Sequence, residues 1–164
     1  MKPENLVIPA NKWQLGYNPI TKINEKDSTG MAFGIMRLSA GEVVEQELSF
    51  ETAFILLSGS CTYVTDNLFL NVERSSIFNE DPSVLHLAKG ENYKIICLSD
   101  CEFAHVATPN EKNFAPMIFT GENMLESERR GKGILNDTAY RIVRTVFDSR
   151  NRENSNFVSF RVEI

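Results

Sequence analysis

The chain lacks the features that nucleic-acid-binding, membrane-spanning and secreted proteins need. Its 17 lysines and arginines form no basic tract and are outnumbered by 22 acidic residues, which gives a net charge of -5. Such a chain is a poor match for nucleic acid or for an anionic membrane surface. The longest apolar runs, such as residues 53–57, are too short to span a bilayer, and the N-terminus has no apolar core of signal-peptide length. We therefore expect a cytoplasmic protein with no nucleic-acid or membrane partner.

Cysteine and histidine are also scarce. The three cysteines are an odd number, and Cys97 and Cys101 have a C-x-x-x-C spacing that is neither the redox nor the zinc-ribbon spacing. We expect reduced thiols that pack as small hydrophobic side chains. The chain has two histidines, whereas a catalytic metal needs about three protein ligands around an open position. We therefore assign no metal ligand and no catalytic residue, and no cofactor, to this chain.

Short apolar runs separated by turn signals fill most of the sequence. They lie at residues 31–38, 53–57, 61–65, 68–72, 84–87, 93–98 and 103–107. Runs of this length, with turn signals about every ten residues and no sustained helical period, are typical of an all-β sandwich or barrel. The pattern predicts an antiparallel β-barrel or jelly roll from about residue 12 to residue 108.

The stretch from Gly41 to Gly59 (GEVVEQELSFETAFILLSG) organises this pattern. A turn signal opens it, a polar run follows, and an apolar strand ends at Ser58-Gly59, directly before the next strand. Strand, glycine turn and strand predict a β-hairpin. Gly34, inside the preceding strand, predicts a bulge or a close backbone approach.

The same stretch resembles the first motif of a cupin. That motif reads Gly, five residues, His-x-His, a Glu a few residues on, and a closing Gly. Here the two histidine positions are Glu47 and Ser49. The frame therefore resembles a cupin-type barrel without its usual metal ligands.

Two more strands are expected near the C-terminus, at residues 140–147 (YRIVRTVF) and 157–164 (FVSFRVEI). A polar loop, residues 148–156, separates them, and we expect it to be mobile. The second strand is similar to MAFGIMRL at residues 31–38, which leads straight into the Gly41 motif. The order resembles a two-cupin protein that stops just before its second motif.

A segment that leads into the first of these two strands resembles one particular family of cupins. Residues 129–144 (RRGKGILNDTAYRIVR) contain an Arg-Gly-x-Gly-x-x-Asn pair of turns and then a Tyr-Arg-x-x-Arg strand. In residues 51–59 (ETAFILLSG) an acid precedes the glycine by eight residues. In this order the two patterns are similar to the N-terminal half of the 5-deoxy-glucuronate isomerases, the KduI/IolB family of the cupin superfamily.

The resemblance implies a bicupin of inositol catabolism that interconverts the aldose and ketose forms of a deoxy-uronic acid. The family holds a divalent metal with three histidines and a glutamate in its second cupin, and none of these ligands has a match here. The resemblance implies an arm at residues 1–30, a cupin β-barrel at 31–120, and a linker with the first strands of a second, incomplete cupin at 121–164. Whether this chain is an enzyme by itself stays open. The alternative is a metal-free cupin that serves as a small-molecule-binding or oligomerisation module.

Five residues are candidates for contacts with a small sugar acid: Glu47, Glu51, His86, Arg141 and Arg144. Glu47 and Glu51 share one strand face, so they could form a mixed site with His86 if that face points into the barrel. The alternatives are a solvated strand end for the acids and a packed imidazole for His86. Arginine binds carboxylates with a bidentate fork, but the odd spacing of Arg141 and Arg144 lets at most one of them point inward.

The C-terminal strands also raise the question of assembly. Burying Val143, Phe147, Phe157, Val158 and Phe160 would contribute about 1.5–3 kcal/mol for each side chain. An unpaired apolar strand is a template for pairing with another chain. The partner is either the sheet edge of the first barrel or the same segment of a second subunit, so we expect a homodimer or a higher homo-oligomer.

Overall fold

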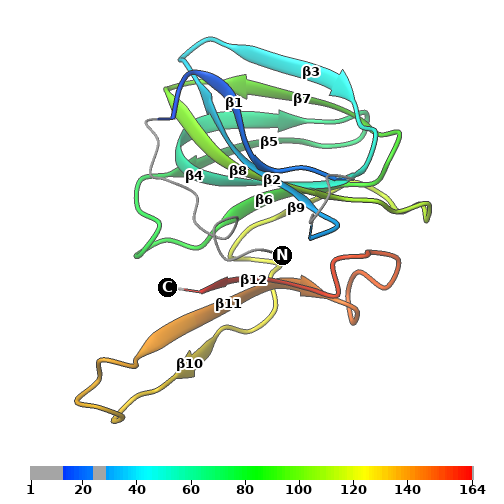
Figure 1. The fold of residues 1–164 in the computed structure, drawn as a ribbon. Helices are drawn as coiled ribbons and strands as arrows, with labels where there is room; N and C mark the ends of the chain where they lie inside the picture. Colours follow the sequence, from blue (N-terminus) through cyan, green and yellow to red (C-terminus); the bar gives the residue numbers. More distant parts are fainter. Residues whose placement is uncertain (1–12, 24–28, 164) are drawn as a thin grey trace.

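The computed structural model describes residues 13–23 and 29–163, which form strands joined by turns and loops (Figure 1). The first twelve residues of the expected arm, and Ile164, lie outside the described residues. The strands are β1 (Gly16–Thr21), β2 (Ala32–Leu38), β3 (Val43–Glu47), β4 (Glu51–Val64), β5 (Phe69–Arg74), β6 (Ser83–Leu87), β7 (Asn92–Cys97), β8 (Cys101–Thr108), β9 (Met117–Phe119), β10 (Glu128–Arg130), β11 (Arg141–Asp148) and β12 (Ser159–Glu163). Within those residues, no helix is long and apolar enough to cross a membrane. The all-β expectation is confirmed.

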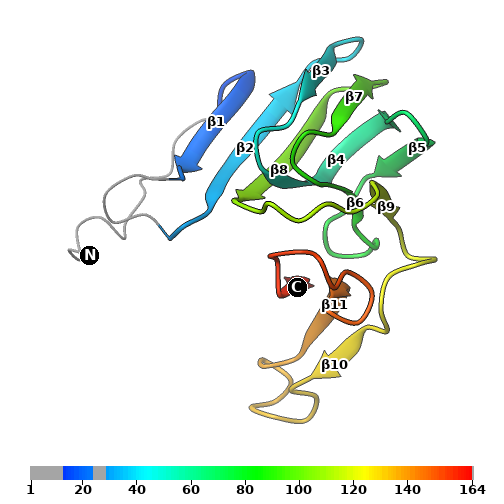
Figure 2. The same cartoon turned by 90° about the vertical axis from the view of Figure 1, so that its right-hand side faces the viewer.

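Nine strands form two layers that share β4. The first layer has the order β1-β2-β8-β4-β6-β9, and the second has the order β3-β7-β4-β5, with every pair antiparallel. Figures 1 and 2 show the layers facing each other, with β3, β7 and β5 on one side and β2, β8 and β6 on the other. The arrangement is a jelly roll that is not closed into a barrel. β1 lies in the segment expected to be an arm, yet it pairs with β2.

Alternation along the strands builds two hydrophobic clusters, one on each face of the first layer. Phe54 and Leu56 of β4 point between the two layers into the main core, whereas Ala53 and Ile55 point to the outer face. Because both faces are covered, β4 and β6 read as continuous apolar runs rather than alternating ones. The outer face is covered by the last three strands of the chain.

The expected hairpin at Ser58-Gly59 is wrong, because β4 continues through it as one strand of 14 residues. A register shift in the pairing with β8, between Leu56 and Ser58, marks a bulge there. Leu56 and Cys61 both belong to the main core, although strict alternation would place residues five apart on opposite faces. The bulge therefore lets one strand pass from the first layer into the second.

Gly59 is expected to be the most sensitive glycine of this crossing. It has a φ of +106°, and a Cβ there would lie 2.4 Å from the Asp100 carbonyl oxygen; Gly90 has a φ of +82° but open space around it. Gly90→Ala should cost about 1–2 kcal/mol for the left-handed backbone alone. Gly59→Ala adds overpacking, about 1–3 kcal/mol more. Urea unfolding of the two variants measures the difference, and equal losses would contradict the close contact.

Other local expectations are confirmed. A Cβ at Gly34 would lie 2.6 Å from the Tyr17 ring, so this glycine permits a close approach. The three cysteines are free and buried. Burial and the neighbouring Cys101 thiol raise the pKa of Cys97 to about 12. These thiols pack as small hydrophobic side chains between the layers, where Cys61 faces Cys97 in the pairing of β4 with β7.

The last three strands form a separate antiparallel sheet with the order β10-β11-β12. The linker before β11 turns as expected, with positive φ at Gly131 and Gly133. Both views show β11 beneath the β6 and β9 side of the jelly roll (Figures 1 and 2). Phe147, Phe157 and Phe160 of this C-terminal sheet and its β11–β12 loop share the outer cluster with Ala53, Ile55 and Val84 of the first layer.

Self-association was predicted because the apolar C-terminal strands were expected to need a partner, and this packing supplies that partner within the chain. Val143, Phe147, Phe157 and Phe160 are buried within one chain, and only Val158, at 80% exposure, stays in solvent. The strands find their cover on the outer face of the first layer rather than at its edge or in a second subunit. A homodimer stays a prediction, and its remaining structural basis is small.

Candidate functional site

The structure brings together two of the five candidate residues. Glu51 starts β4 and His86 lies in β6, and the adjacent pairing of these strands places the His86 Nε2 atom 2.8 Å from the Glu51 Oε1 atom. Both side chains are fully buried. They point to the outer face of the first layer, as Ala53 does, so the condition for a mixed site inside the barrel is not met.

The other three candidates lie elsewhere. Glu47 is exposed on β3, and Arg141 is exposed at the start of β11. Arg144 is buried and donates through its Nε atom to Asp81 at 2.7 Å. The odd spacing therefore does turn one arginine inward and leave the other outside, but Arg144 is committed to a neighbouring carboxylate. The five residues do not converge on one ligand.

The Glu51 carboxylate holds four hydrogen bonds. Its Oε1 atom accepts from His86 Nε2 at 2.8 Å and from Ser155 Oγ at 2.5 Å. Its Oε2 atom accepts from Asn110 Nδ2 at 2.7 Å and from the backbone N–H of Asn156 at 2.9 Å. Ser155 and Asn156 belong to the loop between β11 and β12, so the loop expected to be mobile is held at the end of β4 instead.

The hydrogen-bond partners and the burial of Glu51 and His86 determine the direction in which their pKa values shift. Burial alone would raise the pKa of Glu51, but the hydrogen bonds from His86, Ser155, Asn156 and Asn110 outweigh it, so the pKa lies below its usual value. Burial lowers the pKa of His86, the bond to Glu51 opposes this, and the charge of Arg152 lowers it further. The result is an ionised Glu51 beside a neutral His86.

Arg152 completes the network from the other side of the imidazole ring. Its Nε–H donates to His86 Nδ1 at 3.0 Å, so the His86 proton lies on Nε2 and points to Glu51. The guanidinium lies 4.4 Å from the centre of the Phe114 ring, and the His86 ring stacks on Phe147 at 4.3 Å. Carboxylate and guanidinium balance each other across a neutral imidazole.

This Glu51–His86–Arg152 network joins the first layer to the C-terminal sheet and offers no open position for a substrate. It does not fit the divalent metal that the cupin resemblance implies, because its single carboxylate and single imidazole are both saturated with hydrogen bonds. The described parts of the chain contain no group of three His, Cys, Asp or Glu side chains that could hold a metal ion. We derive no catalytic step through a metal in this chain.

An open space lies elsewhere, between the two layers on the side where β1 and β2 face β3. This interlayer cavity has a volume of about 360 Å³. The side chains that give it its polar and aromatic character are Tyr17, Glu42, Gln46, Phe54, Tyr93 and His105. None of these six residues was among the candidates from the sequence. The one available signal was that Phe103 and His105 share a face of β8.

His105 is neutral in this cavity. Burial lowers its pKa to about 4, and burial raises the pKa of Tyr17, so the phenol keeps its proton. The two side chains meet at 3.2 Å, between the Tyr17 Oη and His105 Nδ1 atoms. With Nδ1 accepting from the phenol, the proton of His105 lies on Nε2 and can be donated to a ligand.

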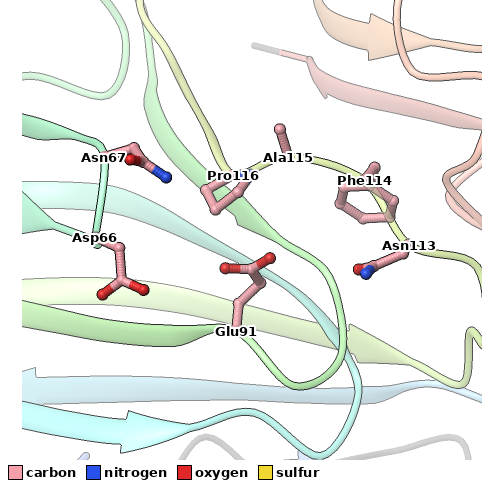
Figure 3. A pocket seen from close by; sticks show the side chains of 7 residues that line it. All are labelled: Asp66, Asn67, Glu91, Asn113, Phe114, Ala115 and Pro116. Atoms are coloured by element: carbon pink, nitrogen blue, oxygen red, sulfur yellow. The ribbon is translucent and has the colours of Figure 1, made fainter.

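A second hollow lies on the outside of the jelly roll. It has a volume of about 490 Å³, with Asp66 and Glu91 on one side and the Phe114–Pro116 segment on the other (Figure 3). Burial and the charge of Asp66 raise the pKa of Glu91. Two carboxylates without a third ligand do not make a metal site, and this hollow is a surface groove.

Comparison with known proteins places the chain in a family. The family model described as KduI/IolB matches residues 6–163, which is nearly the whole sequence. Among curated proteins, none matches the chain. The match extends over the jelly roll and the C-terminal sheet alike.

Solved structures show the same fold at low identity. An IolB-like protein from Salmonella typhimurium is 19% identical, with a TM-score of 0.62 over 73% of this chain and 45% of that one. A putative glyoxylate induced protein from Pseudomonas aeruginosa is 9% identical, with a TM-score of 0.57 over 80% of this chain and 48% of that one. This chain therefore spans about half the length of these two proteins. At these identities the likeness shows the fold alone, and the extent of the family match shows that this chain belongs to the KduI/IolB family.

Proposed function

We propose that this chain takes part in the isomerisation of 5-deoxy-glucuronate between its aldose and ketose forms in inositol catabolism. The observation that carries the proposal is the family match over residues 6–163, which includes both the jelly roll and the C-terminal sheet. The chain belongs to the KduI/IolB family, and we propose the substrate and the pathway from that membership.

The proposal assigns this chain a part that does not hold the catalytic metal. Glu47 and Ser49, at the histidine positions of the cupin motif, are both exposed. Glu51 and His86 are closed off on the opposite face of the first layer by the C-terminal sheet. The side chains that could bind a divalent cation therefore do not converge, so the metal would be held by ligands that the described residues do not supply.

Two experiments test this function. The purified chain is expected to leave 5-deoxy-glucuronate unchanged when manganese, zinc or iron(II) is added in turn, as followed by proton NMR. In the organism that encodes the chain, deletion of its gene is expected to slow growth on myo-inositol and to make 5-deoxy-glucuronate accumulate. Reintroducing the wild-type gene or a Glu47→Ala variant should restore growth, because Glu47 is not a metal ligand in this proposal.

The outcomes separate the two parts of the proposal. Normal growth on myo-inositol without the gene would contradict the role in the pathway. Turnover by the isolated chain with added metal would contradict the assignment of the metal to ligands outside the described residues.

A second candidate is a metal-free cupin that binds a small molecule. The interlayer cavity favours it, because this cavity is open, has aromatic walls and carries polar groups. Normal growth of the deletion strain, together with a ligand bound by the purified chain, would favour this function over the first.

A further inference from the structure

A tyrosine lines the interlayer cavity from β7. Tyr93 as a residue is 4% exposed, and its hydroxyl makes no hydrogen bond to the described residues. A hydroxyl at a cavity wall can donate a hydrogen bond to a ligand or to water. The Nε2–H of neutral His105 is a second donor on the same cavity wall.

Aromatic rings supply the apolar part of the wall. Phe54 and Tyr93 pack against each other with ring centres 4.8 Å apart, and Phe54 also lies 5.1 Å from the His105 ring. Tyr17, half exposed, stands at the opening and contacts His105 edge to face. Aromatic side chains of this kind offer an apolar face together with a polar tip. A ring that carries C–H groups on its faces and hydroxyls on its edge matches both properties.

The charged side chains around the cavity restrict the charge that a ligand can carry. No lysine or arginine among the described residues lines it, and Glu42 is the one acidic residue that places a carboxylate on its wall. That carboxylate accepts the Ser39 backbone N–H at 2.9 Å, so it is already held at the rim. An entering carboxylate or phosphate would be desolvated with no cation to pair with and would face a like charge. The charge therefore disfavours an anionic ligand.

The cavity also has the size of a small-molecule site. Its volume of about 360 Å³ lies at the lower end of the range for such sites, about 300–1,000 Å³. We propose that the interlayer cavity binds one uncharged monosaccharide or cyclic polyol without a metal, with Tyr93 and His105 donating to its hydroxyls. This inference goes beyond the isomerase function, whose substrate is an acid, and does not depend on it.

Saturation-transfer NMR on the full chain tests the inference with four probes: D-glucose, myo-inositol, D-glucuronate and D-glucosamine. We expect D-glucose or myo-inositol to bind, and D-glucuronate to bind at least about tenfold more weakly because its unpaired charge must be desolvated. Absence of binding by both uncharged probes at tens of millimolar would overturn the proposal. Binding of D-glucuronate or D-glucosamine more tightly than of either uncharged probe would also overturn it, since the charge argument would then be wrong.

Matched tyrosine variants locate the site. Tyr93→Phe removes only the hydroxyl and should weaken binding about three- to tenfold, the effect of one neutral hydrogen bond. Tyr63→Phe is the control, because Tyr63 is a second tyrosine of the main core whose hydroxyl is buried among the described residues and does not line the cavity. Equal effects of the two variants would place the ligand elsewhere and overturn the assignment. Since both changes keep the ring, both variants should fold, and thermal unfolding checks this.

Discussion

Glu51→Ala is expected to lower the free energy of unfolding by about 3–5 kcal/mol, as when one partner is removed from a buried ion-paired network. The change leaves four donors without their acceptor: His86 Nε2, Ser155 Oγ, Asn110 Nδ2 and the N–H of Asn156. It also removes the carboxylate that balances Arg152. Each unsatisfied buried group costs about 1–3 kcal/mol, and some relaxation of the loop offsets part of the sum.

Urea unfolding measures this loss, with Glu47→Ala as the matched control. Glu47 is an exposed acid close by in the sequence, so its replacement should change the free energy of unfolding by less than about 0.5 kcal/mol. Glu51→Gln keeps the shape and removes the charge, which separates packing from electrostatics. A loss below about 1 kcal/mol for Glu51→Ala, with β11 amides still protected from hydrogen exchange, would show that the network does not hold the C-terminal sheet.

Mild acid is expected to release the C-terminal sheet from the jelly roll. The pKa of His86 is lowered by burial from its usual value of 6.5, so the released form binds a proton that the docked form does not. Docking is therefore fully favourable above about pH 6.5 and weakens as the pH falls toward the lowered pKa. The lowered pKa of Glu51 acts in the same direction below its usual value of 4.5. Acid therefore weakens docking in two successive steps.

Trp13, the single tryptophan, is a built-in reporter of this release, because it packs against the outer cluster. We expect the urea midpoint of its fluorescence to fall between about pH 7.5 and 5, the range in which histidines titrate. The chain has two histidines, and burial lowers the pKa of His105 as well. The variants His105→Gln and His86→Phe separate them: the pH effect on Trp13 should persist in the first and disappear in the second. The opposite pattern would assign the effect to the cavity instead.

Local hydrophobic patterns in the sequence were sufficient to predict most of the strands. Alternating or continuous apolar runs predicted β2, β5, β6, β7, β8 and β11 to within a few residues, because those strands contribute side chains to a core. β3 was not predicted as a separate strand: Glu47 and Glu51 were placed on one strand face, whereas they lie on β3 and β4. Four of the five residues of β3 are exposed, and its strand state comes from backbone bonds to β7. The hairpin error at Gly59 has a physical cause: a glycine with positive φ serves a tight turn and a bulge equally well. Only the pairing partners, which a local pattern does not contain, distinguish the two.

The site depended even more on distant partners. Glu51 and His86 were selected as candidates, but their role was not, because the groups that complete the network are far away in sequence. The Asn156 N–H that binds Glu51 is 105 residues further along, and Ser155 and Arg152 lie in a polar loop without a motif. The interlayer cavity likewise brings together β1, β3, β7 and β8, which only the order of strands makes neighbours.

That separation of 105 residues between Glu51 and Asn156 has a consequence for a chain made from its N-terminus. At about 5–20 residues per second, a ribosome needs roughly 5–20 s to add the segment between them. All nine strands of the jelly roll are complete by Phe119, so the double layer can form while the last three strands are still missing. During that interval Ala53, Ile55 and Val84 lack the cover of the C-terminal sheet, and Glu51 lacks the two donors from Ser155 and Asn156. The nascent protein therefore passes through a stage in which the outer face of the first layer is apolar and exposed. At that stage chaperones or a neighbouring chain compete with the C-terminal sheet for binding to this face.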